Sequence, residues 1–391
     1  MSPPGRRARR EALAVLAAAG CGLRAAPALA GESFYPPIVR GVPLAFARDH
    51  GAHPAYRTEW WYLTGWLQRL DGAHRGQPVG VQVTFFRSRT RHDAANPSRF
   101  APTQLLLVHA ALALPERGEL VHSQRAARAG FGLASASEQD TALSIDGWTL
   151  ERDAADRYHA RIEDRRFALE LDAGAHAPPV PQGDAGFSRK GPLERQASRY
   201  YSRPQLRARG AIRVEGARAA VEGVAWLDHE WSSEILDPTA EGWDWTGLNL
   251  DDGSALVAFR IRRRDGGIAW SYARRIGAAG AASPGAASPG AASRGVASPG
   301  VAASGGDPAV RFVPVRRWTS PRTGAQYPVA MRVELGARTI TLEPLFDDQE
   351  LDARASTGTI YWEGAVRAFE AGREIGRGYL ELTGYAGVLR L

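Results

Sequence analysis

The chain has 391 residues, of which 44% are hydrophobic and 23% are charged, and its formal net charge is +7 at pH 7. Residues 1–30 contain five arginines and one glutamate, so they carry +4 of this charge. The other +3 belongs to scattered arginines, which argues against a nucleic-acid-binding protein. Cys21 is the only cysteine, which excludes a disulfide framework and a thiolate metal site.

The first thirty residues have the order of a signal peptide. Arginines up to Arg10 precede an apolar stretch at 12–20, and Ala-Leu-Ala at 28–30 resembles a cleavage site. The apolar stretch is about half the ~20 residues that a membrane-spanning helix needs. We therefore expect an exported protein of the periplasm or cell envelope with no transmembrane segment. A lipid anchor at Cys21 is the alternative, and the general secretory and twin-arginine routes both stay open.

Short segments of alternating apolar and polar residues follow, separated by frequent glycines and prolines. They lie at 79–85, 157–162, 167–171, 211–215, 256–261, 329–335, 338–342 and 378–383. This period of two is typical of strands, and no segment has a helical period over more than two turns. The sequence predicts an all-β fold. The ~360 residues after the leader exceed one β-domain, so we expect two barrels or sandwiches.

An internal repeat supports two units. Residues 59–65, EWWYLTG, align without a gap with residues 241–247, EGWDWTG. Each copy is followed by an Asp-Gly turn, at 71–72 and at 252–253, and then by a segment that ends in Phe-Arg. We interpret the two copies as the first hairpins of two duplicated β-units. The alternative is two unrelated tryptophan-rich strands.

A low-complexity insert interrupts the second unit. Residues 277–306 are mainly Gly, Ala, Ser and Pro in a five-residue repeat. Such a segment has nothing with which to build a core, and we expect it to be disordered. The segments at 268–275 and 310–318 look like neighbouring strands of one sheet. We therefore interpret the insert as an expanded hairpin loop.

Four motifs together resemble one family, the exported lipocalin-like proteins that include AttH, other proteins described as predicted secreted hydrolases, and the carotenoid 1,2-hydratases. The motifs are HPAYRTEWWY at 53–62, YYSRP at 200–204, WLDHEWSS at 226–233 and YWEGAV at 361–366. The resemblance extends from about Tyr35 to Leu391. It implies two tandem lipocalin-like β-barrels, here at 31–232 and 233–391. It also implies an elongated hydrophobic ligand, isoprenoid or lipid, and an ABC-type transport system as a partner.

The resemblance leaves the activity open. In the hydratases, the His-x-Trp element that corresponds to His229 and Trp231 is implicated in adding water to the terminal double bond of an acyclic carotenoid without a cofactor. Asp228 and Glu230 beside it are instead typical of the AttH branch. The first hypothesis is thus a ligand-binding envelope protein, and the second a cofactor-independent hydro-lyase. A structural protein with filled barrels is the third.

Hydration of an isolated alkene requires a proton donor, shelter for a tertiary cation and a base for the incoming water. Buried carboxylic acids supply the first, indole rings the second and a histidine the third. If 226–231 is a strand, alternation places His229 and Trp231 on one face. Asp228 and Glu230 then lie on the other face. We favour His229 and Trp231 as the residues that line the lumen.

Asp244 is a further candidate proton donor, because the first copy of the repeat has Tyr62 at the aligned position. A carboxylate flanked by Trp243 and Trp245, with no lysine or arginine nearby in the strand, is costly to ionise if buried. Alternation places Asp244 opposite these two tryptophans, so we expect Trp231 to supply part of the aromatic shelter. The alternative is an exposed aspartate that caps a turn.

The two repeated segments also supply the candidate ligand contacts, which are Glu59, Trp60, Trp61, Tyr62, Trp243 and Trp245. The tryptophans suit a barrel core equally well, and Glu59 suits a hydrogen bond to the backbone or to arginine. No histidine pair has the spacing of a zinc helix, and no Gly-x-Ser-x-Gly elbow occurs. We therefore expect no metal, no cofactor and no serine hydrolase. We expect His50, His53, His109 and His159 to be structural.

Overall fold

The computed structural model describes residues 34–92, 95–98, 100–278, 301–303 and 310–389. Tyr35–Leu391 cluster into one compact unit. The signal peptide expected at 1–30, with its lipid-anchor alternative, lies outside the described residues. No helix among the described residues has the length and hydropathy of a membrane span.

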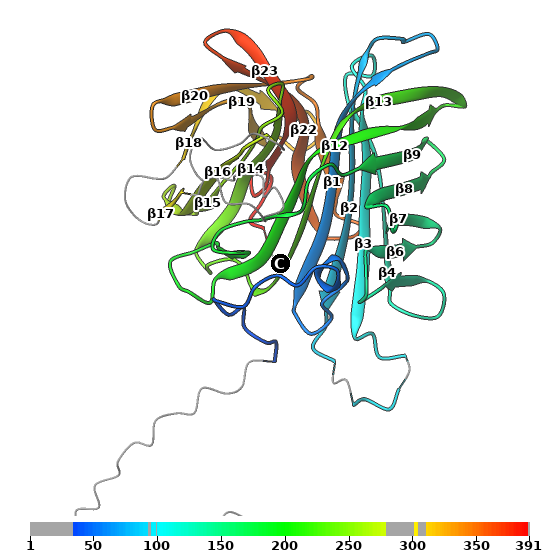
Figure 1. Ribbon diagram of the computed structural model, residues 1–391, viewed down its shortest axis with the longest axis vertical. Coiled ribbons are helices and arrows are strands. Elements are labelled where there is room, and N and C mark those ends of the chain that lie inside the picture. Colours follow the sequence, from blue (N-terminus) through cyan, green and yellow to red (C-terminus); the bar gives the residue numbers. More distant parts are fainter. Residues whose placement is uncertain (1–33, 93–94, 99, 279–300, 304–309, 390–391) are drawn as a thin grey trace, which may run out of the picture. The chain divides into compact units, whose positions relative to one another are not determined.

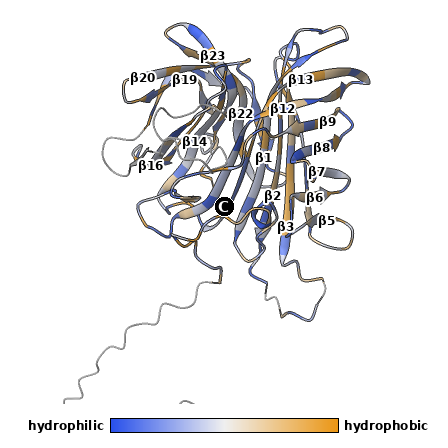
Figure 2. Cartoon of the chain, in the orientation of Figure 1, coloured by the Kyte–Doolittle hydropathy of each residue, from blue (hydrophilic) through white to orange (hydrophobic). Residues whose placement is uncertain are grey.

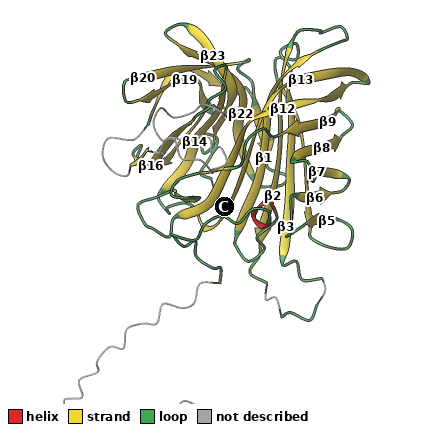
Figure 3. Cartoon of the chain, in the orientation of Figure 1, coloured by secondary structure: helices red, strands yellow, loops and turns green. Residues whose placement is uncertain are grey.

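Strands make up nearly all of the regular structure, as the sequence predicts (Figures 1 and 3). The one helix in the described part of the chain is a three-residue 3₁₀ helix, η1, at Arg48–His50. The strands form two antiparallel sheets that build two barrel-like domains. Apolar and hydrophilic residues are intermixed along them (Figure 2).

The first sheet is a nearly closed barrel of thirteen described strands. Its order is β4-β3-β2-β1-β13-β12-β9-β8-β7-β6-β5, and β10 and β11 pair with β12 outside this order. The bounds are β1 Thr58–Arg69, β2 Pro78–Arg89, β3 Gln104–Ala113, β4 Leu120–Arg128, β5 Ala134–Ala136, β6 Ala142–Ile145, β7 Trp148–Arg152, β8 Arg157–Glu163, β9 Phe167–Gly174, β10 Val180–Pro181, β11 Phe187–Arg189, β12 Ala197–Val214 and β13 Ala217–Glu234.

The second sheet is a half-barrel of ten described strands. Its order is β17-β16-β15-β14-β23-β22-β20-β19-β18, and β21 pairs with β22. The bounds are β14 Ala240–Leu250, β15 Ala255–Arg263, β16 Ile268–Ile276, β17 Val301–Ala303, β18 Arg311–Thr319, β19 Gln326–Leu335, β20 Arg338–Pro344, β21 Glu350–Ala353, β22 Thr359–Glu370 and β23 Arg373–Leu382.

The two copies of the internal repeat form the first hairpin of each sheet, β1–β2 and β14–β15. The aligned residues do not face the same way, however. A Cβ on Gly65 would meet Val81 and Ala225 in the core of the first barrel, whereas a Cβ on Gly247 would meet Trp226 and Trp245, where the sheets pack together. The repeat therefore predicts the order of the elements correctly, but it does not predict which face each residue presents.

Most of the insert expected to be disordered, 277–306, lies outside the described residues. The expectation that the flanking strands are neighbours is wrong. β16 pairs with β15 and β17, whereas β18 pairs with β19 at the other end of the strand order. Val301–Ala303 pair with β16 instead. Residues 320–325 form a short connection between β18 and β19, and closing a short connection costs less conformational entropy than closing a long one.

The two sheets pack closely through the outer face of β1 and β13. Both faces of these strands are covered, so burial along Trp60–Gly65 and Ala225–Ser232 is nearly continuous rather than alternating. One face joins the core of the first barrel, and the other joins a cluster that includes Tyr62, Trp226 and residues of the second sheet. Any residue that faces outward from these strands is therefore held between two layers.

The surroundings of Gly80 on β2 show that the second sheet lies close to the first. A Cβ on Gly80 would stand 2.6 Å from the Cβ of Ala365 and 2.7 Å from the hydroxyl of Tyr379. Both contacts are shorter than real Cβ contacts, so a side chain at this position would push the sheets apart.

We predict that Gly80→Ala lowers the free energy of unfolding by about 1–3 kcal/mol through overpacking. The matched control is Gly174→Ala on β9, where a Cβ meets nothing closer than 3.7 Å and should be neutral or slightly stabilising. Denaturant unfolding of both variants measures the difference. Equal stability of Gly80→Ala and the wild type would show that the sheets do not approach this closely.

Candidate functional site

A cavity of about 320 Å³ lies between the packed faces of the two sheets. β1, β2, β3 and β13 supply one wall, and β14, β15, β22 and β23 supply the other. Most of the lining is apolar or aromatic and includes Trp60, Phe86, Leu107, Trp243, Trp245, Phe259 and Ile261. The cavity is thus built from the outer face of the first barrel, not from its interior.

Besides Glu59, which pairs with Arg87, four carboxyl groups line this apolar space. Asp228 and Glu230 come from β13, Glu363 from β22 and Glu381 from β23. Asp228, Glu230 and Glu363 are 2%, 5% and 1% exposed, and Glu381 is partly buried. The one lysine of the chain, Lys190, joins them and is 4% exposed. One ammonium group cannot neutralise four carboxylates, so this composition favours carboxyls that keep their protons.

Asp228 accepts hydrogen bonds from three side chains. The hydroxyls of Tyr200 and Ser202 each donate to it at 2.6 Å, and the indole nitrogen of Trp226 donates at 2.7 Å. Burial raises the pKa of Asp228 to about 7, although these hydrogen bonds oppose the rise. The group therefore exchanges a proton near neutral pH.

Glu230 is paired with Lys190. The ammonium nitrogen lies 2.8 Å from the carboxylate and 3.0 Å from the hydroxyl of Ser188. It also stands 4.1 Å from the centre of the Phe259 ring and 4.6 Å from that of Tyr200. Burial lowers the pKa of Lys190, and the nearby carboxylates oppose this. The pair is enclosed by aromatic rings that favour the cation.

Glu363 and Glu381 lie directly opposite each other on β22 and β23. Tyr62 from the first sheet donates a hydrogen bond to Glu363 Oε1, and the indole nitrogen of Trp243 donates to Glu381 Oε2 at 3.0 Å. Burial, with the neighbouring Glu381, raises the pKa of Glu363 well above its usual value. Burial raises the pKa of Glu381 to about 7.

His109 reaches the same cavity from β3. Its Nδ1 lies 2.7 Å from the hydroxyl of Tyr361 and its Nε2 lies 2.8 Å from that of Ser356. Burial lowers the pKa of His109 to about 3, so the ring is neutral. A neutral imidazole can accept a proton, but both of its nitrogens already have hydrogen-bond partners.

His229 and Trp231, which the sequence analysis favours as lumen residues, do not line this cavity. Alternation along β13 is as predicted, but the cavity lies on the Asp228 and Glu230 face. His229 is fully buried in the first barrel, where its Nε2 donates to Glu59 at 2.9 Å and its ring stacks on Trp61. The sequence-based expectation places the ligand in a barrel lumen, whereas this cavity lies between the sheets.

Glu59 anchors a buried network around His229. It accepts hydrogen bonds from the backbone and the ring of His53 and pairs with Arg87 at 2.7 Å. Burial would raise the pKa of Glu59, but hydrogen bonds from His229 and His53 and the charge of Arg87 outweigh it and hold that pKa well below the usual value. Trp231 stacks on His53 with 3.6 Å between ring centres.

The ligand atoms of His53, Glu59 and His229 lie within 4.8 Å of one another, a spacing that a metal ion can use. The donor set does not favour one. Glu59 already has an arginine partner, and the outer nitrogens of the two rings bind Asp49 and Tyr201. A divalent cation would face the Arg87 guanidinium across the carboxylate. We therefore treat the cluster as a hydrogen-bond network that also borders the cavity wall at Glu59.

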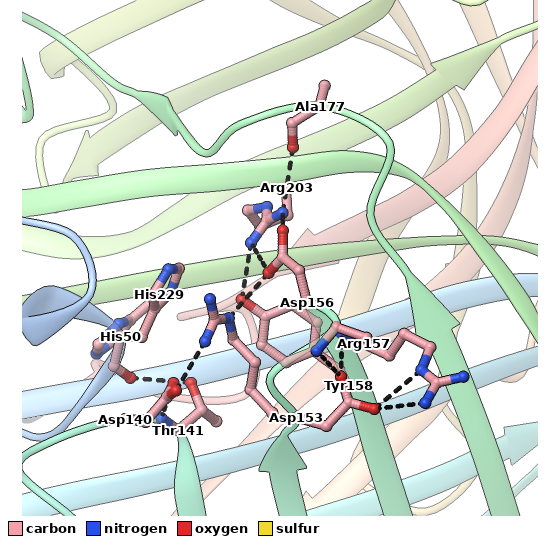
Figure 4. Close-up of polar contacts among 12 residues, drawn as sticks. His50, Asp140, Thr141, Asp153, Asp156, Arg157, Tyr158, Ala177, Arg203 and His229 are labelled. Atoms are coloured by element: carbon pink, nitrogen blue, oxygen red, sulfur yellow. Dashed lines mark hydrogen bonds and ion pairs between the residues drawn. The ribbon is translucent and has the colours of Figure 1, made fainter.

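A second polar network surrounds Arg203 of β12 nearby (Figure 4). Arg203, only 1% exposed, pairs with Asp156 and donates to the hydroxyl of Tyr158 and the carbonyl of Ala177. Thr141 donates to the carbonyl of His50 on the side where Figure 4 places His229. Side chains and a backbone carbonyl of this network therefore hold the buried guanidinium group of Arg203.

Asp244 lies away from the cavity. The expectation that no arginine lies nearby is wrong, because Arg260 is its direct partner on β15 and Arg262 follows. Their guanidinium groups stand 2.6 and 3.2 Å from the fully buried carboxylate, and Tyr385 donates to it at 2.9 Å. This pairing removes the argument that the carboxylate is costly to ionise. Counting outward from the Asp252-Gly253 turn would have placed Arg260 opposite Asp244.

The aromatic candidates are divided between the two faces. Trp60, Tyr62, Trp243 and Trp245 border the cavity, as the ligand-contact prediction requires. Trp61 instead belongs to the core of the first barrel, and its indole nitrogen donates to the carbonyl of His50.

Sequence reasoning did not select Lys190, Glu363, Glu381 or His109, all of which reach the cavity. Two signals were available. Lys190 is the only lysine, and Glu363 lies within the Tyr-Trp-Glu-Gly motif at 361–364. Neither signal says that these residues meet Asp228, because strands distant in sequence bring them together.

We predict that the raised pKa of Asp228 makes stability depend on pH. The folded protein binds this proton more tightly than the unfolded chain, so the free energy of unfolding falls as pH rises from the ordinary value of 3.8 to about 7. At about 1.4 kcal/mol for each pKa unit, the effect is on the order of a few kcal/mol. Asp228→Asn should flatten the slope in denaturant unfolding between about pH 5 and pH 8.

The exposed Asp251 supplies the control, because Asp251→Asn should keep the wild-type slope. Wild type and Asp228→Asn with the same pH slope would contradict the assignment of a bound proton to Asp228.

Comparison with known proteins is consistent with the fold. The sequence model of the AttH-like family matches residues 37–385. The crystal structure of a putative AttH from Nitrosomonas europaea is 45% identical, with 90% of this chain and 99% of that chain covered and a TM-score of 0.78. Kievitone hydratase from Nectria haematococca shares the fold with a TM-score of 0.61, over 90% of this chain and 98% of that one, at 13% identity. No curated protein matches the sequence. The chain belongs to the AttH-like family.

Proposed function

We propose that this AttH-like protein binds an uncharged, apolar, unsaturated molecule between its two sheets and adds water to a C=C bond without a cofactor. One observation carries this proposal. Asp228, Glu363 and Glu381 have raised pKa values and line a cavity whose other walls are mainly aromatic and aliphatic. Neutral carboxylic acids beside an apolar ligand are the donors that alkene protonation requires.

The free-energy cost of burying the four carboxyl groups argues against a protein that only stores a ligand. Burying a carboxyl group without full compensation is unfavourable, and replacement of buried charged groups by apolar residues is often stabilising. A protein that only held a hydrocarbon would gain nothing from four carboxyls in its binding site. Their presence is explained if they act on the ligand.

The remaining cavity residues suit the later steps. The rings of Trp60, Trp243 and Trp245 can stabilise a cation that forms on the substrate. Carboxylates of the cluster can take the proton that the attacking water loses. Kievitone hydratase carries a hydratase name on a related fold, which is compatible with this proposal but assigns no activity at 13% identity.

The volume of the cavity limits how much of a long ligand can lie between the sheets. About 320 Å³ is near the lower end of the ~300–1,000 Å³ of small-molecule sites. An elongated isoprenoid or lipid would place only one end between the sheets, and the rest would pass Ile235, Leu236 and Leu389 at the border shared with a neighbouring pocket. Export to the envelope and partnership with an ABC-type transport system stay predictions.

Incorporation of oxygen from labelled water tests the proposal. We first identify the bound molecule by mass spectrometry of organic extracts, and then incubate the protein with this and related polyenes in labelled water. The product should gain one labelled oxygen, and Glu381→Gln, which removes one of the carboxyl groups of the cavity, should slow its formation by about 100-fold, a typical contribution of acid–base catalysis. Asp244→Asn, which changes a carboxyl outside the cavity, should retain activity to the extent that it folds.

If the wild type binds such ligands but no labelled oxygen enters any of them, the chain is a binding protein and the hydro-lyase proposal is wrong.

Ligand binding itself predicts a fluorescence change. Polyene or fatty-acid probes should quench tryptophan emission saturably, because Trp60, Trp243 and Trp245 border the cavity. Trp243→Phe should lose part of the quenching, whereas Trp148→Phe, a change in the core of the first barrel, should not. Absence of saturable quenching by every probe, in protein shown to be folded, would favour the structural alternative.

A further inference from the structure

We propose that Glu363 is the proton donor of this cavity and that Glu381 and Tyr62 keep the proton on the Glu363 oxygen that faces the ligand. The proposal rests on the proposed function, because it assigns a role within the same reaction. It adds a residue that the hydratase resemblance does not indicate, since the His-x-Trp element lies on the other face of β13.

The pairing of β22 and β23 forces the two carboxyls together. Glu363 and Glu381 are register partners, and Trp245 is the partner of Glu381 on β14, so the three side chains form one row across the sheet. Like charges directly opposite each other in a sheet are destabilising, and two adjacent buried carboxyls ionise one at a time. Once one carboxyl of the pair has ionised, the other therefore keeps its proton to higher pH.

The surroundings decide which carboxyl keeps that proton. Glu381 is partly buried and accepts a hydrogen bond from Trp243, which favours its carboxylate. Glu363 is 1% exposed, and its Oε2 has no hydrogen-bond partner among the described residues. A negative charge on an oxygen with no donor is the costlier state. The proton therefore stays on Glu363.

Tyr62 fixes the orientation of the donor. Its hydroxyl reaches across from the first sheet and donates to Oε1. Oε2, which has no partner among the described residues, is then the oxygen that holds the proton, on a side chain that lines the cavity. When Glu363 loses its proton, the same hydroxyl stabilises the new carboxylate. Tyr62 is thus a positioning residue, and it links the donor to the packing of the two sheets.

The reaction balances with water as the second reactant. The O–H bond of Glu363 breaks, and the π electrons of the alkene form a C–H bond with the proton. Water then forms the C–O bond to the cation, and the Glu381 carboxylate takes the proton that water releases. Proton transfer from Glu381 back to Glu363 restores the pair, and the net change is alkene plus water to alcohol.

Infrared spectroscopy tests where the proton lies without any substrate. At about pH 8, above the pKa of about 7 of Asp228 and Glu381, the wild type should still show the carbonyl stretch of a protonated carboxylic acid. Glu363→Gln should lose this band. Glu350→Gln, a buried glutamate outside the cavity that bonds to Ser320, should keep it. A band that persists in Glu363→Gln, or none in the wild type, overturns the assignment.

Activity then separates this proposal from the proposed function. Where the wild type incorporates labelled oxygen, Glu363→Gln should lose about 100-fold or more of the rate while it retains ligand binding. Glu363→Asp should recover part of that rate, and Tyr62→Phe should shift the pH–rate profile. Full activity of Glu363→Gln overturns the donor assignment alone. No oxygen incorporation by the wild type overturns the proposed function and, with it, the catalytic role.

Discussion

The close packing of the second sheet against the outer face of β1 and β13 is the constraint on which the rest of the structure depends. It turns two strands that would otherwise be half exposed into a layer buried on both sides, and it makes glycine necessary at position 80. Because the sheets touch around a cavity of about 320 Å³, each outward-facing residue of these strands either packs or lines the cavity. The site is therefore a property of the interface between two barrels, and neither barrel alone would form it.

Polar groups on the two sides of the layer formed by β1 and β13 lie in different surroundings. On the inner face, Glu59 is compensated by Arg87 and by hydrogen bonds from His53 and His229, so it stays ionised and rigid. On the outer face, one lysine serves four carboxyls, and burial raises the pKa of three of them. The first arrangement is typical of structural support, and the second is typical of a site poised to exchange protons. Adjacent residues of one strand thus belong to different functional layers.

The sequence predicts the local features of this fold well. The β8–β9 and β19–β20 hairpins, the two opening hairpins and the alternation at 226–231 all follow from short-range patterns, since turn residues and a period of two act within a few positions. It does not predict which face of β13 meets the ligand space, because that depends on a second sheet whose strands lie more than one hundred residues away at β22 and β23. The arginine partners of Asp244 are the intermediate case, since hairpin register would have revealed them.

A crystal structure of the protein with its native ligand captured tests the central claim most directly. The account predicts that an apolar end of the ligand lies between the two sheets, against Trp243 and Trp245, with an unsaturated carbon next to the free oxygen of Glu363. A ligand found inside the first or the second barrel, beside His229 or Asp244 and away from the four carboxyls, would contradict it.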